Sequence, residues 1–108
     1  MRGSPTASRR SRSPSVRYEL RFHPDALDEW GRLDRAVREQ LKKKVAQRLD
    51  EPIVPASRLA GRPNRYKIKL RSAGIRLVYE VRETEVILLV IAVGRRERNA
   101  VYDSAARR

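Results

Sequence analysis

The sequence predicts an α+β fold in which helices pack on one face of a mainly antiparallel, four-stranded sheet. Three patterns lead to this prediction. Apolar and charged residues alternate with period two in one segment near the start and in two later segments, which is typical of strands. Two segments between them repeat their apolar residues at helical spacing, and a late segment is continuously apolar. The expected order is strand, helix, helix, strand, strand, strand, then a C-terminal tail or short helix.

Composition limits both the size of the domain and its chemistry. With 108 residues and 40% hydrophobic content, the chain is expected to bury one core. It has no cysteine and one histidine, so disulfides, thiolate catalysis and a histidine-based metal site are not expected. A cofactor is not expected either. The histidine, His23, stands at an expected helix start, where a catalytic role is not expected.

The formal net charge of +13 predicts a polyanionic partner, either nucleic acid or an acidic protein. No apolar run reaches the roughly 18 residues that a transmembrane helix needs, and the N-terminus lacks the apolar core of a signal peptide. We therefore expect a cytoplasmic protein without a membrane partner.

Two regions are expected. Residues 1–16 (MRGSPTASRRSRSPSV) are basic and rich in Ser, Pro and Arg, which predicts a disordered extension. This extension is either a nonspecific basic arm for RNA or a segment without a specific role, and its presence in the natural protein is an open question. Residues 17–108 contain all the patterned segments and form the expected domain.

The first strand and first helix come next in the chain. VRYELRF (16–22) alternates apolar and charged residues and predicts a strand. HPDALDEWGRL (23–33) places Pro24 where helices favour a first-turn proline. Its apolar residues at helical spacing are Leu27, Trp30 and Leu33.

A longer helix is predicted from Asp34, a favourable N-cap, to Pro52, which ends it. Its apolar residues lie four apart: Val37, Leu41, Val45 and Leu49. Lys43, in the run 42–44, could contact an RNA backbone, although such runs are usually solvated helix faces. Residues 51–64 have three prolines and a glycine and predict a loop.

RYKIKLRSAGIRLVYEV (65–81) predicts two strands joined near 72–74, and EVILLVIAV (85–93) predicts an interior strand because it is apolar on both faces. Alternation assigns one face of the hairpin to the core: Tyr66, Ile68, Leu70, Ile75, Leu77 and Tyr79. It assigns the other face to cations: Lys67, Lys69, Arg71 and Arg76.

Further cations follow the last strand, namely Arg95, Arg96 and Arg98, and Tyr102 comes after them. Lysines and arginines beside a tyrosine suit single-stranded RNA, because cations bind phosphate and the ring stacks on a base. The same pattern also fits a solvated strand face and a tail tyrosine packed on the core.

LDEWGRL, VREQLKKK, YKIKLRSAGIRLVYEV and VGRRERNAVY resemble the RelE group of the RelE/ParE toxin superfamily, from about residue 17 to 106. The resemblance implies a RelE-like fold and an mRNA interferase, an endoribonuclease that cuts mRNA in the ribosomal A site without metal. The ribose 2′-OH would be the nucleophile, and the products a 2′,3′-cyclic phosphate and a 5′-OH.

Carried over by motif, the catalytic residues implied by the resemblance are Lys67, Lys69, Arg76, Arg96 and Tyr102. Lys69 would be the general base, because crowding by neighbouring cations should lower its pKa. Arg96 would assist the leaving 5′ oxygen, either as an acid or by its charge, and this choice stays open. The RNA-binding candidates are Arg71, Arg95, Arg98 and Lys43.

The implied partners are the ribosome with its 16S rRNA, mRNA, and a RelB-like acidic antitoxin that covers or displaces the C-terminal segment. Promoter DNA would be bound only through the antitoxin complex. Two alternatives remain: a ParE-like gyrase inhibitor and a noncatalytic RNA- or ribosome-binding protein. Ala60 and Arg62 depart from the family's loop, so codon preference, like the antitoxin's identity and stoichiometry, is not specified.

Overall fold

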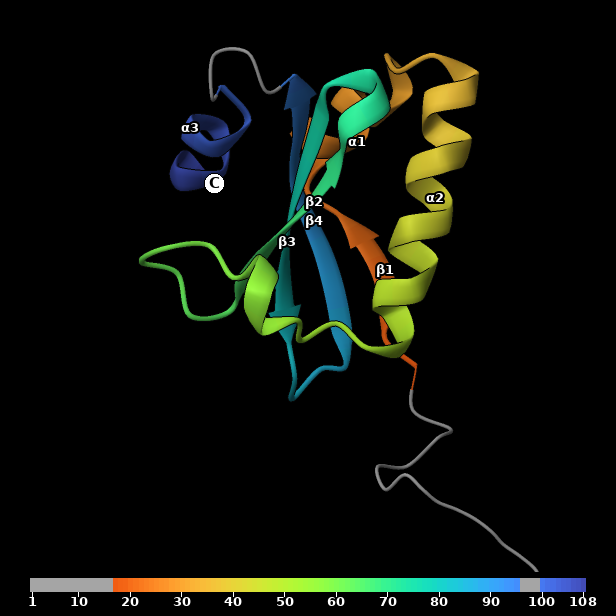
Figure 1. Cartoon of the computed structure of the whole chain (residues 1–108). Helices are drawn as coiled ribbons and strands as arrows, with labels where there is room; N and C mark the ends of the chain where they lie inside the picture. Colours follow the sequence, from red (N-terminus) through yellow and green to blue (C-terminus); the bar gives the residue numbers. More distant parts are fainter. Residues whose placement is uncertain (1–16, 96–99) are drawn as a thin grey trace, which may run out of the picture.

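The computed structural model describes residues 17–95 and 100–108. Figure 1 shows helices on both sides of a central sheet. The helices and strands are β1 (Glu19–Phe22), α1 (Pro24–Gly31), α2 (Arg35–Asp50), β2 (Arg65–Leu70), β3 (Ile75–Arg82), β4 (Ile87–Arg95) and α3 (Ala100–Arg107). This is the predicted order, with the C-terminal segment present as a short helix.

The sheet has the strand order β1-β4-β3-β2. β1 pairs with β4 in parallel, whereas β2–β3 and β3–β4 are antiparallel, so the sheet is mainly antiparallel as predicted. β4 therefore has a neighbour on each side, as predicted. Its side chains join apolar clusters on both faces of the sheet, which explains its continuous apolar sequence. The remaining connections include two 3₁₀ turns, Pro55–Ser57 and Arg71–Ala73.

The two predicted helices, α1 and α2, begin differently. His23 is the N-cap of α1, and its Nδ1 accepts a hydrogen bond of 3.1 Å from the backbone N–H of Asp25. The histidine therefore has a structural role at the helix start. Asp34 does precede α2, but its side chain makes no capping hydrogen bond.

The larger core lies between the sheet and α1 and α2. Leu41 and Val45 of α2 are buried there, and Val37 and Leu49 pack at its margin, as the four-residue spacing predicts. The six hairpin residues assigned to the core are all buried: Tyr66, Ile68, Leu70, Ile75, Leu77 and Tyr79. Alternation therefore identified the core face of β2 and β3 correctly.

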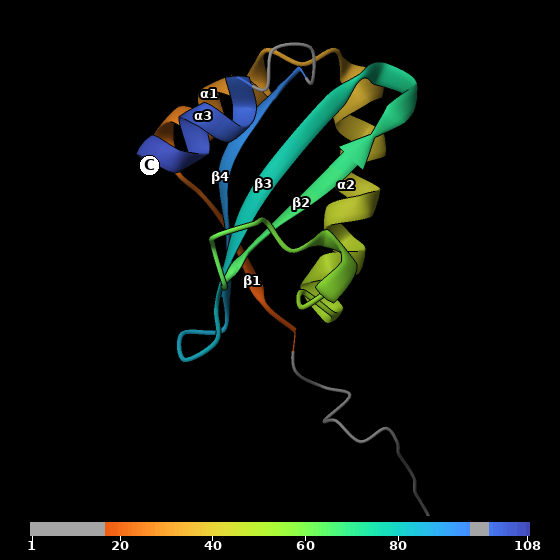
Figure 2. The same cartoon turned by 60° about the vertical axis from the view of Figure 1, so that its left-hand side comes forward.

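The opposite face of the sheet is only partly cationic, which differs from the sequence-based expectation. A second apolar cluster on this face joins Val78, Ile91 and Ala92 to Val101 and Ala105 of α3. Figures 1 and 2 show α3 on one side of the sheet and α2 on the other. The predicted arrangement of helices on one face thus holds for α1 and α2, whereas α3 covers part of the second face.

A β-bulge in β4 changes which residues face the core. Tyr79 pairs with Val90, but Val78 pairs with Ala92, so Ile91 is an extra residue on β4. Val90 and Val93 consequently both face the larger core, although their numbers differ in parity. Every side chain after the bulge lies on the face opposite to the one that simple alternation predicts.

Arginines attach α3 to the sheet. Arg65, which is buried on β2, donates a hydrogen bond of 2.6 Å to the carbonyl of Ala105 and one of 3.0 Å to the carboxylate of Glu80. At the end of the chain, Arg108 donates to the carboxylate of Glu29 at 2.9 Å and to the carbonyl of Ile91 at 2.8 Å. The position of α3 therefore depends on ionic contacts as well as on its apolar face.

The Arg65–Glu80 pair predicts a loss of stability in acid. Burial alone would raise the pKa of Glu80, but hydrogen bonds from Arg82 and Arg65 outweigh it, and the net pKa lies below 4.5. The stabilisation is thus present above pH 4.5 and is lost as the pH falls through the lower, folded-state pKa. Glu80→Gln should reduce the free energy of unfolding by about 2 kcal/mol at pH 7.

Urea denaturation at pH 7 and pH 3 checks this prediction. The difference in free energy of unfolding between the wild type and Glu80→Gln should be smaller at pH 3 than at pH 7. Glu83→Gln, at an exposed position, should have the free energy of unfolding of the wild type at both pH values. A difference that does not change with pH would contradict the assigned role of Glu80.

Candidate active site

The cationic side chains of β2 and β3 lie side by side on the face opposite to the larger core. Lys67 and Lys69 alternate with buried neighbours on β2 and are themselves partly exposed. In the antiparallel register, Lys69 is directly opposite Arg76 of β3. Residues directly opposite in such a pair have their Cβ atoms about 5 Å apart, so two cations are held close together by the backbone pairing.

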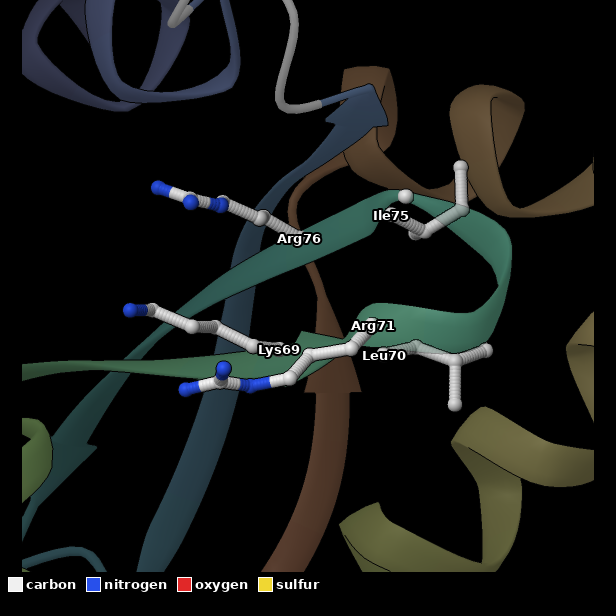
Figure 3. Close-up of a pocket in the computed structure, with 6 residues that line it drawn as sticks. Lys69, Leu70, Arg71, Ile75 and Arg76 are labelled. Carbon is white, nitrogen blue, oxygen red and sulfur yellow. The ribbon is translucent and has the colours of Figure 1, made fainter.

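Arg71 joins this group from the turn that follows β2. It begins the 3₁₀ turn Arg71–Ala73 and is thus not the strand residue that was predicted, and Gly74 closes the turn with a left-handed φ of 65°. Figure 3 shows the side chains of Lys69, Arg71 and Arg76 extending to one side, while Leu70 and Ile75 point to the other. Lys69, Arg71 and Arg76 line a small pocket.

The lysine at the centre of this group has an altered pKa. The charges of Lys67 and then Arg76, followed by partial desolvation and the charge of Arg71, lower the pKa of Lys69 below 10.5. The predicted direction and its predicted cause are both present in the structure. A lysine of lowered pKa is neutral for a larger fraction of the time and can accept a proton.

Tyr102 of α3 lies over this cationic face. The guanidinium of Arg76 donates a hydrogen bond of 2.9 Å to the Tyr102 hydroxyl, and its Cζ atom is 5.5 Å from the centre of the ring. The ring is half-buried. Residues 26 positions apart in the sequence are thus brought into direct contact at the face where Lys67 and Lys69 lie.

Two predicted RNA-binding residues are not brought to this face. Arg95 pairs with Ile75 and lies on the side of the larger core, because the bulge at Ile91 reverses the alternation of β4. Lys43 is exposed on α2, on the other side of the sheet from Lys69. Arg96 and Arg98 lie outside the described residues.

Two arginines that were not among the predicted catalytic or RNA-binding residues line a hollow beside Lys67 and Tyr102. These are Arg65, the first residue of β2, and Arg62, in the preceding loop. Arg65 could have been found, because it continues the period-two row of Lys67 and Lys69. No such signal exists for Arg62, since its position depends on the path of the loop.

Comparison with known families identifies the chain. The model of the family described as "ParE toxin of type II toxin-antitoxin system, parDE" matches residues 20–100. The chain belongs to the RelE/ParE toxin family. Within this family it is 52% identical to the mRNA interferase toxin RelE of Escherichia coli K12 over 84% of this chain and 96% of that protein. A putative RelE-like toxin protein of E. coli is 46% identical over 86% and 98% of the two chains.

Solved RelE structures have the same fold. A double arginine-to-alanine mutant of E. coli RelE in the free state superposes with a TM-score of 0.79 at 48% identity, covering 84% of this chain and 96% of that one. RelE in the intact E. coli RelBE toxin–antitoxin complex superposes with a TM-score of 0.72 at 52% identity, covering 75% and 99%. The resemblance read from the sequence motifs is thereby confirmed, and it is to the RelE branch.

Within the described part of this RelE-family chain, no helix is both long and apolar enough to cross a membrane.

Proposed function

We propose that this protein is the toxin of a type II toxin–antitoxin system and acts as an mRNA interferase, an endoribonuclease that cuts mRNA in the ribosomal A site. The main structural support is the pair formed by Lys69 and Arg76 with Tyr102 bound to Arg76, which places a base of lowered pKa beside a fixed cation and a ring. The similarity to a protein named mRNA interferase toxin RelE supports the same activity.

In the proposed reaction, neutral Lys69 accepts the proton of the ribose 2′-OH, and the 2′ oxygen attacks the adjacent phosphorus. Negative charge grows on the phosphorane oxygens, where Arg76 and Lys67 stabilise it. The bond to the 5′ oxygen breaks, and the departing oxygen takes a proton from Arg96 if Arg96 is the acid, or from solvent if Arg96 assists only by its charge. A 2′,3′-cyclic phosphate and a 5′-OH are formed, and no metal takes part in these steps.

The ribosome supplies positioning in this proposal. A lysine and arginines are weak catalysts at neutral pH, so the RNA must be held in a reactive geometry, and the ribosomal A site with its 16S rRNA would hold it. Arg71 and Arg98 would bind backbone phosphates. Lys43 and Arg95 would contact RNA outside the catalytic face.

An acidic, RelB-like antitoxin is the second proposed partner. A net charge of +13 favours fast capture by an acidic protein, and α3, held largely by side-chain contacts, is the segment such a partner would cover or displace. Promoter DNA would be bound only by the complex, with the antitoxin contacting the DNA. The cytoplasm, where mRNA is translated, is the compartment that this activity requires.

The test is cleavage on programmed ribosomes. Purified protein is added to ribosomes with an empty A site, and mRNA ends are mapped by primer extension, with naked mRNA as the control. Cuts inside the A-site codon that appear with ribosomes and not with naked mRNA support the proposal. Ribosome binding without cuts would indicate a noncatalytic binding protein, and inhibition of gyrase instead would indicate ParE-like activity.

The lowered pKa of Lys69 predicts how the reaction depends on pH. The single-turnover rate should rise with pH and level off at the folded-state pKa of Lys69, below 10.5, because only neutral lysine accepts the proton. Lys67→Gln should move this inflection to higher pH, since the charge of Lys67 is the largest cause of the lowered pKa.

An NMR titration of the Lys69 ε-methylene group in the free protein measures the same shift without ribosomes. Equal inflections in the wild type and in Lys67→Gln would contradict the proposed crowding of Lys69.

A further inference from the structure

A hollow of about 360 Å³ lies beside the proposed catalytic residues, between the loop before β2, the sheet and α3. Its volume is within the range of ligand pockets, about 300–1,000 Å³. We call it the α3 hollow. Its apolar lining consists of Leu59, Ala60 and Ala106. Its cationic rim consists of Arg62, Lys67 and Arg76.

The arginines around the α3 hollow differ in whether they are free to bind a ligand. Arg65 is buried and already bound to Glu80 and to the carbonyl of Ala105, so it lines the hollow without being available to a ligand. Arg62 is exposed, and within the described residues its guanidinium makes one hydrogen bond, a long one of 3.3 Å to the carbonyl of Ala106. Its guanidinium can exchange this weak contact for a phosphate at little cost.

The α3 hollow is continuous with the proposed catalytic site. Lys67, Arg76 and Tyr102 belong to both, and Arg76 holds Tyr102 by a hydrogen bond. An RNA strand with its reacting phosphate at Lys69 and Arg76 therefore has its neighbouring nucleotide at the α3 hollow. Aromatic and apolar surface beside cations is what an unstacked base and its phosphate require.

We propose that the α3 hollow binds the nucleotide next to the cut, with its base on the apolar lining and its phosphate on Arg62, and that it determines the sequence preference of cleavage. This inference rests on the proposed function and names the substrate subsite that the function needs. Gly61, with a left-handed φ of 76°, makes the turn that places Ala60 in the lining and Arg62 on the rim.

Two variants separate the two halves of the proposal. Arg62→Ala removes the phosphate contact, whereas Ala106→Leu fills the α3 hollow from an exposed helix position without changing charge. Arg35→Ala is the matched control, because it removes one exposed arginine from α2, on the other side of the sheet. Arg62→Lys keeps the charge but not the planar fork.

The first measurement is cleavage of a set of A-site codons on programmed ribosomes. Ala106→Leu should reduce the rate ratio between the best and worst codons by about tenfold, because base contacts specify sequence. Arg62→Ala should slow all codons alike by about tenfold, because a phosphate contact is sequence-independent, and Arg62→Lys should recover part of the rate. Arg35→Ala should leave the codon ranking unchanged.

The second measurement does not depend on cleavage. Binding of labelled 2′-O-methyl RNA trinucleotides, which lack the nucleophile, is followed by fluorescence anisotropy with the free protein. Arg62→Ala should lower the salt dependence of binding by about one counterion relative to Arg35→Ala, and Ala106→Leu should weaken binding about tenfold.

The outcomes distinguish this inference from the proposed function. If the wild type cuts mRNA but Ala106→Leu keeps the codon ranking, the α3 hollow is not the specificity subsite. If the wild type does not cut but the trinucleotides bind as described, the hollow is an RNA site and only the enzymatic proposal fails. If neither variant differs from Arg35→Ala in binding, the inference is overturned.

Discussion

Replacing Lys69 with alanine should abolish growth arrest and reduce mRNA cleavage by about 10²–10⁴-fold, the usual contribution of a general base. The domain should remain folded, since the Lys69 side chain faces away from the core. Its melting temperature should stay equal or rise, because the substitution removes a cation that repels Lys67 and Arg76.

Two further variants show what Lys69 does. Lys69→Arg keeps the positive charge but cannot supply a neutral base, so it should be as inactive as Lys69→Ala. Lys44→Ala removes an exposed lysine from α2 and should keep wild-type toxicity. Full activity of Lys69→Arg would show that this position acts by charge alone, and full toxicity of Lys69→Ala would remove the mechanism.

The second large effect is expected at Arg76. Arg76→Ala should lower the cleavage rate by about 10²–10³-fold, because it removes a cation directed at the phosphorane. It should also raise the pKa of Lys69, which the charge of Arg76 lowers, and it leaves the Tyr102 hydroxyl without its donor. Single-turnover cleavage across pH measures both consequences in one experiment.

Matched substitutions divide the role of Arg76 into parts. Arg76→Lys should restore the pH profile but only part of the rate, because an ammonium group does not bind phosphate in a bidentate manner. Tyr102→Phe keeps the ring and loses only the hydrogen bond, so its effect should be below about tenfold. If Tyr102→Phe were as defective as Arg76→Ala, Arg76 would act mainly by positioning Tyr102.

Local patterns were sufficient to predict the hairpin and the shared face of Lys67, Lys69 and Arg76. The alternation in residues 65–81 predicted that Tyr66 and Ile68 face the core while Lys67 and Lys69 face away, and the structure confirms this. It also predicted Arg76 on the same face as Lys69, because the two strands pair across a short turn. In these segments the period of two continues without interruption.

Long-range features were not predictable. The bulge at Ile91 reverses alternation within one strand, and an apolar run contains no signal for such an insertion. Arg95 was expected after the last strand, and the sequence could not show that it ends β4 on the side of the larger core. The position of α3 depends on a hydrogen bond from Arg65 to the carbonyl of Ala105, which lies 40 residues later in the sequence. The position of Arg62 against α3 depends likewise on a loop whose path no periodicity describes.

The parallel pairing of β1 with β4 has a consequence for the synthesis of this protein. Glu19 to Phe22 align with Ile87 to Val90, so the first strand finds its only partner in the described sheet near the end of the chain. A nascent chain still short of these residues cannot complete its sheet. β1 therefore stays without its strand partner until residues 87–90 have been synthesised, so the described sheet is completed late in the synthesis of the domain.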